Sequence, residues 1–313
     1  MLRLRLLSAA VILAVLFALV WLDYERMFVG VEGVWLLPIF VVVTILATEE
    51  VLSLFAAKGY RPVAWPLYVG NVLLSLAACG PIWVKLLNLD TTRGLPHELV
   101  QPLGQLGLPL LVLGLWSAVV FAAEMQQFQK PGRAAVQMAM AIFTLLYVGV
   151  LYGFLAALRL IHGHEWGLLA LLSFLTVVKM ADTGAYFTGR LLGRRKMTPV
   201  LSPKKTVEGA IGGIAAACAS SWAVFYFAGP FLVRSTFVMP SVIGWLTYGL
   251  VIAIAGMVGD LAESLLKRDM ERKDSSTWLP GLGGVLDIID AVLVAGPFAY
   301  GCWLLGLVGP GVS

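Results

Sequence analysis

Acidic, basic and hydroxyl side chains recur at helical spacing near the C-terminal end of one long apolar stretch. Asp260, then Glu263 or Ser264, and then Lys267 follow the spacing i, i+3/i+4, i+7. In a helix these positions share one face. Charged side chains inside an apolar stretch are costly in lipid and usually face the interior of a helix bundle. The spacing therefore predicts a polar face that looks away from lipid.

A glycine-rich loop and two further carboxylates follow in the chain. Residues 280–284 read Pro-Gly-Leu-Gly-Gly, and Asp287 and Asp290 come next, three residues apart on one predicted helix face. Such a loop exposes backbone N–H groups at the start of a helix, where anions bind. Carboxylates hold Mg²⁺ while substrate phosphates complete its shell, and cations with amide N–H groups offset phosphate charge. Asp260, Asp287, Asp290 and the neighbouring lysines and arginines therefore predict phosphate chemistry with Mg²⁺.

Two upstream segments carry further polar residues. Asp182 lies three residues after Lys179, on one helix face, and Gly184 and Gly189 after it permit close approach of another backbone. The second segment reads Ser-Pro-Lys-Lys over residues 202–205. Ser202 before Pro203 predicts an N-cap with proline at the first helical position. That would present Lys204 and Lys205 in a first helical turn, either to bind an anion or as cytoplasmic loop charge near anionic lipids.

The elements that must position these residues are membrane-spanning helices. Of the 313 residues, 60% are hydrophobic and 13% are charged, about half the charge of a soluble domain. Stretches of about 20 apolar residues, long enough to span a membrane, recur along the whole chain. They lie near residues 5–22, 33–56, 64–88, 105–123, 135–158, 166–188, 207–229, 241–265 and 284–308. We therefore expect an all-α polytopic membrane protein with about nine spans, because lipid requires internal backbone hydrogen bonds.

The distribution of basic residues predicts the orientation. With nine spans, most of the 22 lysines and arginines fall on the side of the N-terminus. The positive-inside rule then places the N-terminus in the cytoplasm, and with it the polar cluster. We expect N-terminal helices over 1–160 and a C-terminal catalytic region over 161–313. Glu49 and Glu50 stay open as a helix-end or interhelical pair, or as carboxylates that support the site.

The polar residues of the C-terminal region resemble the signature of the integral-membrane phosphatidate cytidylyltransferases. That signature reads approximately Ser-x-x-Lys-Arg-x4-Lys-Asp, an apolar residue, Pro-Gly-His-Gly-Gly and Asp-x-x-Asp. The matching residues are Ser264, Lys267, Arg268, Lys273, Asp274, Leu279, Pro280, Gly281, Gly283, Gly284, Asp287 and Asp290. Two upstream segments of the family also match, at 181–186 and 202–209. Leu282 stands where the family usually has histidine, and Ile288 where arginine is frequent.

The resemblance implies a nucleotidyltransferase of phospholipid biosynthesis in the inner membrane, with its active site on the cytoplasmic side. CTP and phosphatidic acid would give CDP-diacylglycerol and pyrophosphate. Asp260 and Asp287 are expected to bind one or two Mg²⁺ ions, with Asp290, Lys267 and Arg268 completing the catalytic set. Substrate contacts are expected from Asp182, Ser202, Lys204, Lys205, Ser264, Lys273, Asp274, Gly281, Gly283 and Gly284.

Other functions stay open at this point. A related CTP-dependent enzyme could act on a polyprenol or another lipid. An ion-coupled transporter would use the carboxylates for H⁺ or Na⁺, but midplane broken helices and inverted repeats are expected there. An inactive homologue is a third alternative because of Leu282. The net charge of +4 does not suggest nucleic acid, and the sequence leaves open a homodimer, the lipid preference and the role of the first five spans.

Overall fold

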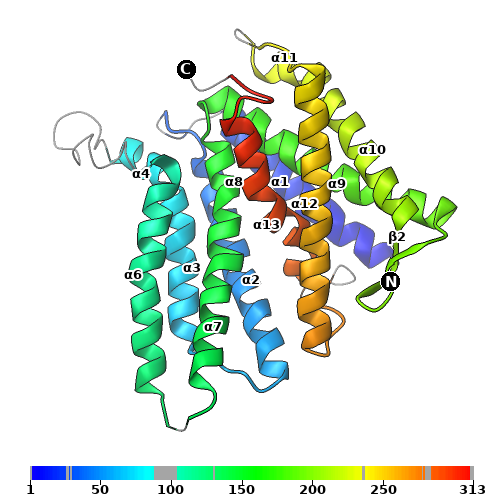
Figure 1. Cartoon of the computed structure of the whole chain (residues 1–313). Coiled ribbons are helices and arrows are strands. Elements are labelled where there is room, and N and C mark those ends of the chain that lie inside the picture. The colour runs from blue at the N-terminus through cyan, green and yellow to red at the C-terminus, as the bar shows by residue number, and fades with distance from the viewer. Residues whose placement is uncertain are drawn as a thin grey trace. The chain divides into compact units, whose positions relative to one another are not determined.

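The structure is a computed structural model, and it describes residues 2–25, 28, 30–87, 104–129, 131–234, 237–276, 278 and 283–310. The chain is mostly helical (Figure 1). The α-helices before residue 160 are α1 (Leu2–Glu25), α2 (Leu37–Ala57), α3 (Ala64–Ala78), α4 (Gly80–Leu86), α6 (Gly104–Gln126), α7 (Ala134–Thr144) and α8 (Leu151–Arg159). Those after it are α9 (His164–Leu192), α10 (Val207–Ala223), α11 (Gly229–Leu232), α12 (Val242–Asp269) and α13 (Leu286–Leu304).

Short elements complete the described chain. A 3-10 turn, η1 (Val34–Leu36), precedes α2, and two π-helical segments, η2 (Leu145–Val150) and η3 (Val224–Ala228), continue α7 and α10. The strands β1 (Lys196–Thr198) and β2 (Ser202–Thr206) form an antiparallel hairpin. The all-α fold is confirmed, with this small hairpin as an addition.

The chain is a multi-pass membrane protein. Within the described residues, 7 helical runs are long and apolar enough to cross a membrane. They are Val34–Ala57, Leu106–Gln126, Ala134–Arg159, His164–Leu192, Val207–Leu232, Val242–Asp269 and Leu286–Leu304. The predicted third span is a pair, α3 and α4, bent by 66° at a break before Gly80 and Pro81. The count of nine and the cytoplasmic N-terminus stay predictions.

Exposed apolar side chains cover the long helices. On α6, Leu110, Leu111 and Leu115 are all exposed, and Ile243 and Val258 of α12 are exposed as well. A soluble protein would bury most side chains of this kind. In a helix of membrane-spanning length they are the surface that meets lipid, as the composition predicts.

The chain divides into two compact units. The first unit comprises Met1–Leu160 and Met270–Ile288, and the second comprises Ile161–Asp269 and Ile289–Ser313. The segment 270–288, which holds much of the signature, therefore packs with the N-terminal helices. The predicted division into N-terminal helices over 1–160 and a catalytic region over 161–313 concerns function, and it stays a prediction.

In the first unit, long helices pack side by side. Neighbouring pairs are α2 with α3, α3 with α6, and α6 with α7 (Figure 1). Their buried centre is built from Leu67 and Leu74 of α3, Val120 of α6, Ala141 of α7 and Leu145 of η2. Leu67 and Leu74 are seven residues apart and lie on one stripe of α3, which is the usual way in which a bundle buries its core.

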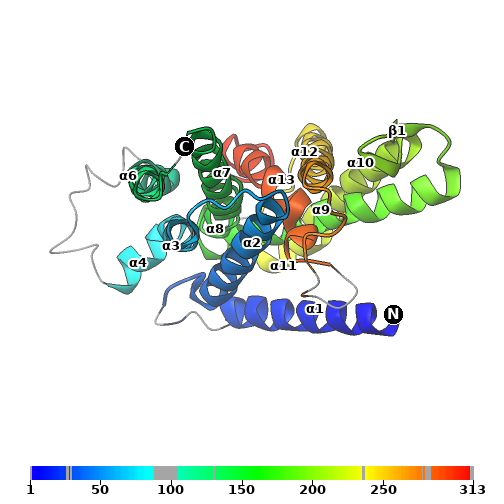
Figure 2. The ribbon, with the colours of Figure 1, turned by 90° about the horizontal axis from the view of Figure 1, so that it is seen from below.

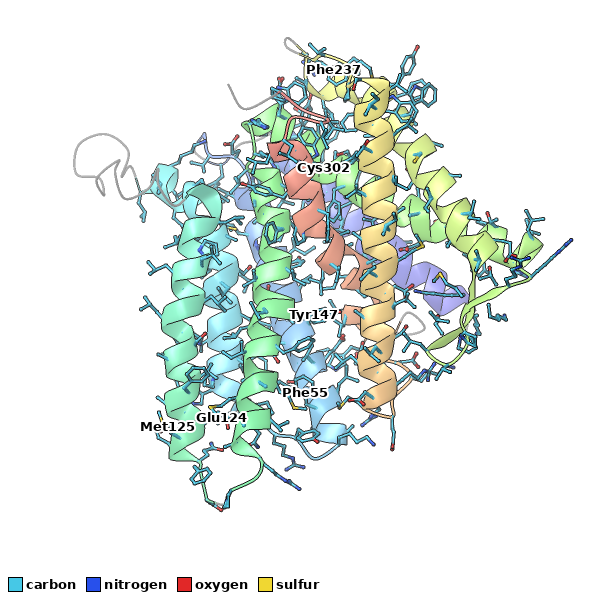
Figure 3. The ribbon with its side chains drawn as sticks, in the orientation of Figure 1. Phe55, Glu124, Met125, Tyr147, Phe237 and Cys302 are labelled. Carbon is cyan, nitrogen blue, oxygen red and sulfur yellow. The ribbon has the colours of Figure 1, made fainter. Side chains whose placement is uncertain are left out.

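Polar and aromatic contacts add to the packing of the first unit. Figure 3 shows Glu124 and Met125 at the end of α6, and the Glu124 carboxylate accepts a hydrogen bond of 2.7 Å from the backbone N–H of Val63. Phe143 lies between Phe55 and Tyr147, with ring centroids 6.2 and 5.1 Å away. These contacts fix the ends and faces of α2, α6 and α7.

In the second unit, α9 packs along α10, and α12 packs against both (Figure 2). Trp303 of α13, Phe225 of η3 and Tyr248 of α12 are fully buried and form a chain of ring contacts about 6 Å apart between centroids. This aromatic core lies towards one end of the helices. The hairpin lies at the other end of α9 and α10, where the polar residues gather.

Candidate functional site

Glycines bring the backbones of α9 and α10 close together. A Cβ atom added at Gly184 of α9 would lie 2.9 Å from the carbonyl oxygen of Gly212. A Cβ at Gly213 of α10 would lie 2.9 Å from the carbonyl oxygen of Ala181. Larger residues at these positions would push the helices apart. The sequence prediction that Gly184 and Gly189 permit close approach of another backbone is confirmed, because Gly189 faces Gly209 in the same way.

The segment Ser202–Thr206 is a strand, so the predicted N-cap at Ser202 is wrong. Lys196 pairs with Thr206, and Thr198 pairs with Ser202, across the hairpin. Both strands of a two-stranded sheet are edge strands, where a proline such as Pro203 is tolerated. Lys204 and Lys205 therefore lie on a strand, and α10 starts four residues later than the local Ser-Pro pattern indicated, at Val207 rather than Pro203.

Thr206 is the residue that caps α10. Its hydroxyl oxygen accepts a hydrogen bond of 3.1 Å from the backbone N–H of Gly209, as an N-cap side chain does. Glu208, in the first turn, accepts hydrogen bonds of 3.0 and 3.1 Å from the backbone N–H groups of Arg194 and Arg195. Thr206 and Glu208 thus hold both ends of the hairpin and fix the lysines between them.

A cavity of 410 Å³ lies between α9, the hairpin, α10 and α12. Its volume falls in the range of sites for small molecules. The charged residues among its lining are Asp182, Arg190, Lys204, Lys205 and Asp260. Alanines, glycines and methionines form most of the remaining wall. The second unit therefore brings four predicted site residues together around one cavity, and adds Arg190.

Lys205 and Asp260 form an ion pair at this cavity. The Nζ atom of Lys205 lies 2.6 Å from Oδ2 of Asp260, and the side chains are 21% and 38% exposed. A second, longer pair joins Lys179 and Asp182 at 3.5 Å. Lys204 is exposed, whereas Lys205 is half-buried. Of the two lysines, Lys205 is thus the one held in place at the carboxylate.

Asp290 lies on α13, and a glycine of α12 permits the approach of that helix. A Cβ at Gly259 would lie 2.6 Å from the carbonyl oxygen of Asp290 and 3.0 Å from the Cα of Ala291. Asp290 is buried and interacts electrostatically with Asp260 and Asp182. The second unit therefore contains Asp182, Asp260 and Asp290, with α13 packed closely against α12.

The end of α12 carries the first residues of the signature. Lys267 forms an ion pair of 2.6 Å with Glu263, one helical turn earlier, and both side chains are largely buried. Ser264 is half-buried and Arg268 is exposed. Of the predicted phosphate-binding pair, Lys267 therefore already has a carboxylate partner, and Arg268 faces outward.

Asp287 belongs to the first unit and is bonded to the segment before its helix. Its Oδ2 atom accepts hydrogen bonds from the backbone N–H of Ser275 at 3.2 Å, the hydroxyl of Ser275 at 2.8 Å, and the backbone N–H of Gly284 at 2.7 Å. A carboxylate that reaches back to such N–H groups caps the start of a helix. In this arrangement the carboxylate of Asp287, predicted to bind metal, holds Ser275 and Gly284 on either side of the glycine-rich segment.

The other predicted residues of the first unit are placed as follows. Lys273 and Asp274 are exposed. Gly283 has a φ of 93°, which favours glycine. Gly284 is buried, and a Cβ there would collide with Ser275 and Glu50. Gly281 and Leu282 lie outside the described residues, as do Leu279 and Pro280.

The carboxylates of the cavity are compatible with Mg²⁺. Within the part of the chain that the structure describes, no three His, Cys, Asp or Glu side chains are grouped so as to hold a metal ion. Mg²⁺ does not need such a cage, because one or two carboxylates suffice when waters and substrate phosphates complete the shell. Asp260, partly exposed beside the cavity, is a carboxylate of this kind.

Sequence reasoning does not assign a role to three residues that shape the two units: it leaves Glu50 between two alternatives, and Thr206 and Glu208 enter only within the matching segment 202–209. Thr206 is a preferred N-cap residue and lies directly before an apolar helical run. The sequence therefore contained the correct N-cap, but Ser202 followed by proline was a competing candidate. Glu50 offered only the general signal of a charge inside a span. Its four hydrogen bonds reach residues 225 to 236 positions away.

Comparison with known proteins gives one family over almost the whole chain. Residues 3–305 match the model of the family described as "Cytidylyltransferase family". The match therefore includes the first five predicted spans, which the signature does not reach.

Curated relatives named phosphatidate cytidylyltransferase share the sequence in part or over most of its length. The Haemophilus influenzae protein is 39% identical over 137 residues, 44% of this chain and 46% of its own length. The Brucella suis protein is 42% identical over 155 residues, 49% and 54% of the two chains. The Chlamydia pneumoniae protein is 34% identical over 265 residues, 82% and 78%. The chain thus spans about half the length of the first two relatives.

Proposed function

This chain belongs to the cytidylyltransferase family, and we propose that it transfers a cytidylyl group from CTP to phosphatidic acid. The products would be CDP-diacylglycerol and pyrophosphate. The curated relatives carry the name of this activity. The signature over 264–290 and the segments at 181–186 and 202–209 support the same reaction.

The observation that carries the proposal is the charged cavity of the second unit. Lys204, Lys205 and Arg190 supply cations, and Asp182 and Asp260 supply carboxylates, around 410 Å³. Cations that are already positioned stabilise phosphate charge without reorganising during the reaction. An ion pathway would need no cluster of lysine and arginine beside the carboxylates. The residue types therefore favour a polyphosphate ligand over a transported cation.

The proposed reaction is an in-line displacement at the α-phosphorus of CTP. An oxygen of the lipid phosphate forms a bond to that phosphorus, and the bond to the β-phosphate oxygen breaks, so that pyrophosphate leaves. A phosphate monoester is largely ionised at neutral pH because its second pKa is about 6. The attacking oxygen therefore needs no strong general base. The work of the protein is to position both phosphates and to balance their charge.

Named residues have separate roles in this proposal. Asp260 and Asp287 would hold Mg²⁺, with Asp290 in support, and the ion would neutralise the leaving pyrophosphate. Lys205 is held at the cavity by Asp260, where a phosphate can take its ammonium group as a counterion. Lys204, Lys267 and Arg268 would add positive charge, and Asp182 would orient Lys179, its partner at 3.5 Å, or the nucleotide.

The membrane supplies the second substrate. We propose that phosphatidic acid keeps its acyl chains in the bilayer while its phosphate reaches the polar residues from the side. The exposed apolar faces of α6 and α12 place the helices in lipid, which is where this substrate resides. We further propose the inner membrane as the location and its cytoplasmic side as the face of the reaction.

The proposal is tested with purified protein in detergent. The assay would supply Mg²⁺, phosphatidic acid and one nucleoside triphosphate at a time, and would detect CDP-diacylglycerol and pyrophosphate. We expect product with CTP and at most trace product with ATP, GTP or UTP. Competition with polyprenol and with ether-lipid phosphates would identify the acceptor. Absence of a cytidylylated lipid with every acceptor would contradict the proposal.

A further inference from the structure

Glu50, on α2, is a carboxylate buried in the first unit. Its side chain lies more than half-way along the helix and is 2% exposed. Its neighbour Glu49 is exposed and is bonded instead to the hydroxyl of Tyr68 on α3. The two adjacent glutamates therefore have different surroundings, although the sequence offered no reason to separate them. A buried carboxylate requires hydrogen-bond donors that offset its desolvation.

The signature segment supplies those donors. Glu50 Oε1 accepts hydrogen bonds from the hydroxyl of Ser276 at 2.7 Å and the backbone N–H of Val285 at 2.8 Å. Oε2 accepts from the backbone N–H of Leu286 at 2.7 Å and from the hydroxyl of Ser275 at 3.0 Å, whose single proton it shares with Asp287 Oδ2. Within the described residues, every donor to this carboxylate is thus a neutral hydroxyl or amide. None of these contacts is an ion pair, so a charged ligand cannot compete for a cationic partner of Glu50.

The four bonds reach both sides of the glycine-rich segment. Ser275 and Ser276 precede it, and Val285 and Leu286 follow it at the start of α13. The N–H groups at the start of a helix have no partner within the helix, so Glu50 caps α13 from another helix. Since α13 carries Asp287 and then Asp290, the carboxylate fixes where this helix begins.

Two further contacts agree with this arrangement. A Cβ atom at Gly284 would collide with the Glu50 carboxylate and with the Ser275 hydroxyl, so a glycine of the signature is required where Glu50 approaches. The end of α2 is also joined to the same segment, because Lys58 Nζ lies 2.5 Å from Glu271 Oε1. One N-terminal helix therefore contacts the start, middle and end of residues 271–286.

We infer that Glu50 is a positioning residue for the reaction: it holds Ser275, Ser276 and the start of α13 so that Asp287 has its working geometry. One role of the N-terminal helices is then to hold the residues on either side of the glycine-rich segment in position. Asp287 is bonded to Ser275 and Gly284, two residues that Glu50 itself contacts or crowds. Displacement of the loop would move this carboxylate, and a misplacement of 1 Å can lower a rate about 100-fold.

The variant Glu50→Gln tests this inference, with Glu49→Gln as its matched control. Glutamine keeps the shape but places an NH₂ donor against two of the four donors, Ser275 and Leu286 at one oxygen position or Ser276 and Val285 at the other. We expect kcat to fall about 100-fold and KM for CTP to rise by a smaller factor, because the expected substrate contacts at Gly283 and Gly284 lie in the same segment. Glu49→Gln removes the same charge from the adjacent position and should retain wild-type kcat. Equal kcat values for the two variants would overturn the inference.

A second readout follows the loop without any need for activity. Arg272 and Lys273 are exposed trypsin sites next to the held segment. Cleavage after them should be several-fold faster in Glu50→Gln than in wild type or Glu49→Gln. If Glu50→Gln does not fold, Ser276→Ala removes one bond to Oε1 and should raise cleavage and lower kcat to a smaller extent. Unchanged cleavage and unchanged kcat in that variant would also overturn the inference.

The two readouts separate this inference from the proposed function, on which its kinetic arm rests. Wild-type protein without cytidylyltransferase activity would contradict the function, and the cleavage arm would still decide whether Glu50 holds the loop. Faster cleavage with wild-type kcat would show that the loop is held but that its position does not matter for the reaction, which overturns the positioning role.

Discussion

Two carboxylates, Glu50 on α2 and Asp260 on α12, differ in how the protein surrounds them. Glu50 in the first unit is almost fully buried and is bonded by four neutral donors. Asp260 in the second unit is 38% exposed, lies beside a cavity and is paired with the ammonium group of Lys205. A fully satisfied buried carboxylate is suited to fixing structure. A partly exposed one, paired with a cation beside a cavity, is suited to binding a ligand.

The difference divides the polar residues into two groups: those proposed to take part in the reaction and those that hold the structure. The sequence alone does not distinguish the two groups. Thr206 and Glu208 belong with Glu50, because their side chains accept hydrogen bonds from backbone N–H groups. Lys205 and Asp260 form an ion pair at the cavity, where we propose that they bind a ligand. Substitutions on the two sides should therefore have different effects on rate, substrate affinity and stability.

The largest effect is expected from Asp260→Asn. If Asp260 binds Mg²⁺, loss of its charge should lower kcat by about 100- to 1,000-fold, the effect of removing one electrostatic stabiliser. The melting temperature should change little because Asp260 is partly exposed. Initial rates at saturating CTP measure this, with Asp269→Asn at the exposed end of α12 as the control. Wild-type rates in both Asp260→Asn and Asp287→Asn would remove the metal assignment.

A smaller effect separates the two lysines of the hairpin. Lys205 is held beside Asp260, whereas Lys204 is exposed. Since a charge-assisted hydrogen bond contributes about 1.5–3 kcal/mol, Lys205→Met should raise KM for CTP by about 10- to 100-fold. Lys204→Met should raise it less. Steady-state kinetics over a range of CTP concentrations distinguish them, and a larger loss for Lys204 would show that the strand presents its lysines differently to the ligand.

A stability effect is expected on the positioning side. Thr206→Ala removes the N-cap of α10, which costs about 1 kcal/mol and lowers the melting temperature by roughly 2–4 °C. Thr206→Ser keeps the hydroxyl and is the control. Thermal unfolding in detergent, followed by circular dichroism, would measure the difference. Identical melting curves for the alanine and serine variants would show that the cap does not support the hairpin.

The smallest effect concerns Glu271, whose side chain is fully exposed. The hydrogen bond and charge of Lys58 hold the pKa of Glu271 below its usual value of 4.5. Its contribution to stability is therefore present above pH 4.5 and is lost as the pH falls through the lower folded-state pKa. Because salt screens exposed pairs, Glu271→Gln should leave the melting temperature at pH 7 unchanged. A clear fall at physiological salt would show that this pair, too, holds the loop.

Features set by local sequence could be predicted, and features set by distant partners could not. Hydropathy located the spans because a membrane helix needs a continuous apolar run, and spacing placed Asp260 on a polar face. Ser202 and Pro203 suggested a helix start, but pairing with Lys196–Thr198 made that segment a strand. Glu50 could not be assigned, because its partners lie more than 200 residues later in the chain. The signature at 279–282 lies outside the described residues, so its geometry stays a prediction.

The central claim is that the cytidylyl group moves to the lipid, and CTP labelled at single phosphorus atoms tests it directly. Purified protein would be incubated with Mg²⁺, phosphatidic acid and CTP carrying ³²P at either the α- or the γ-position, and the lipid would then be extracted. Cytidylyl transfer predicts label in the lipid from α-labelled CTP and none from γ-labelled CTP, whose label leaves in pyrophosphate. Label in the lipid from the γ-position alone would contradict the account and identify a CTP-dependent lipid kinase.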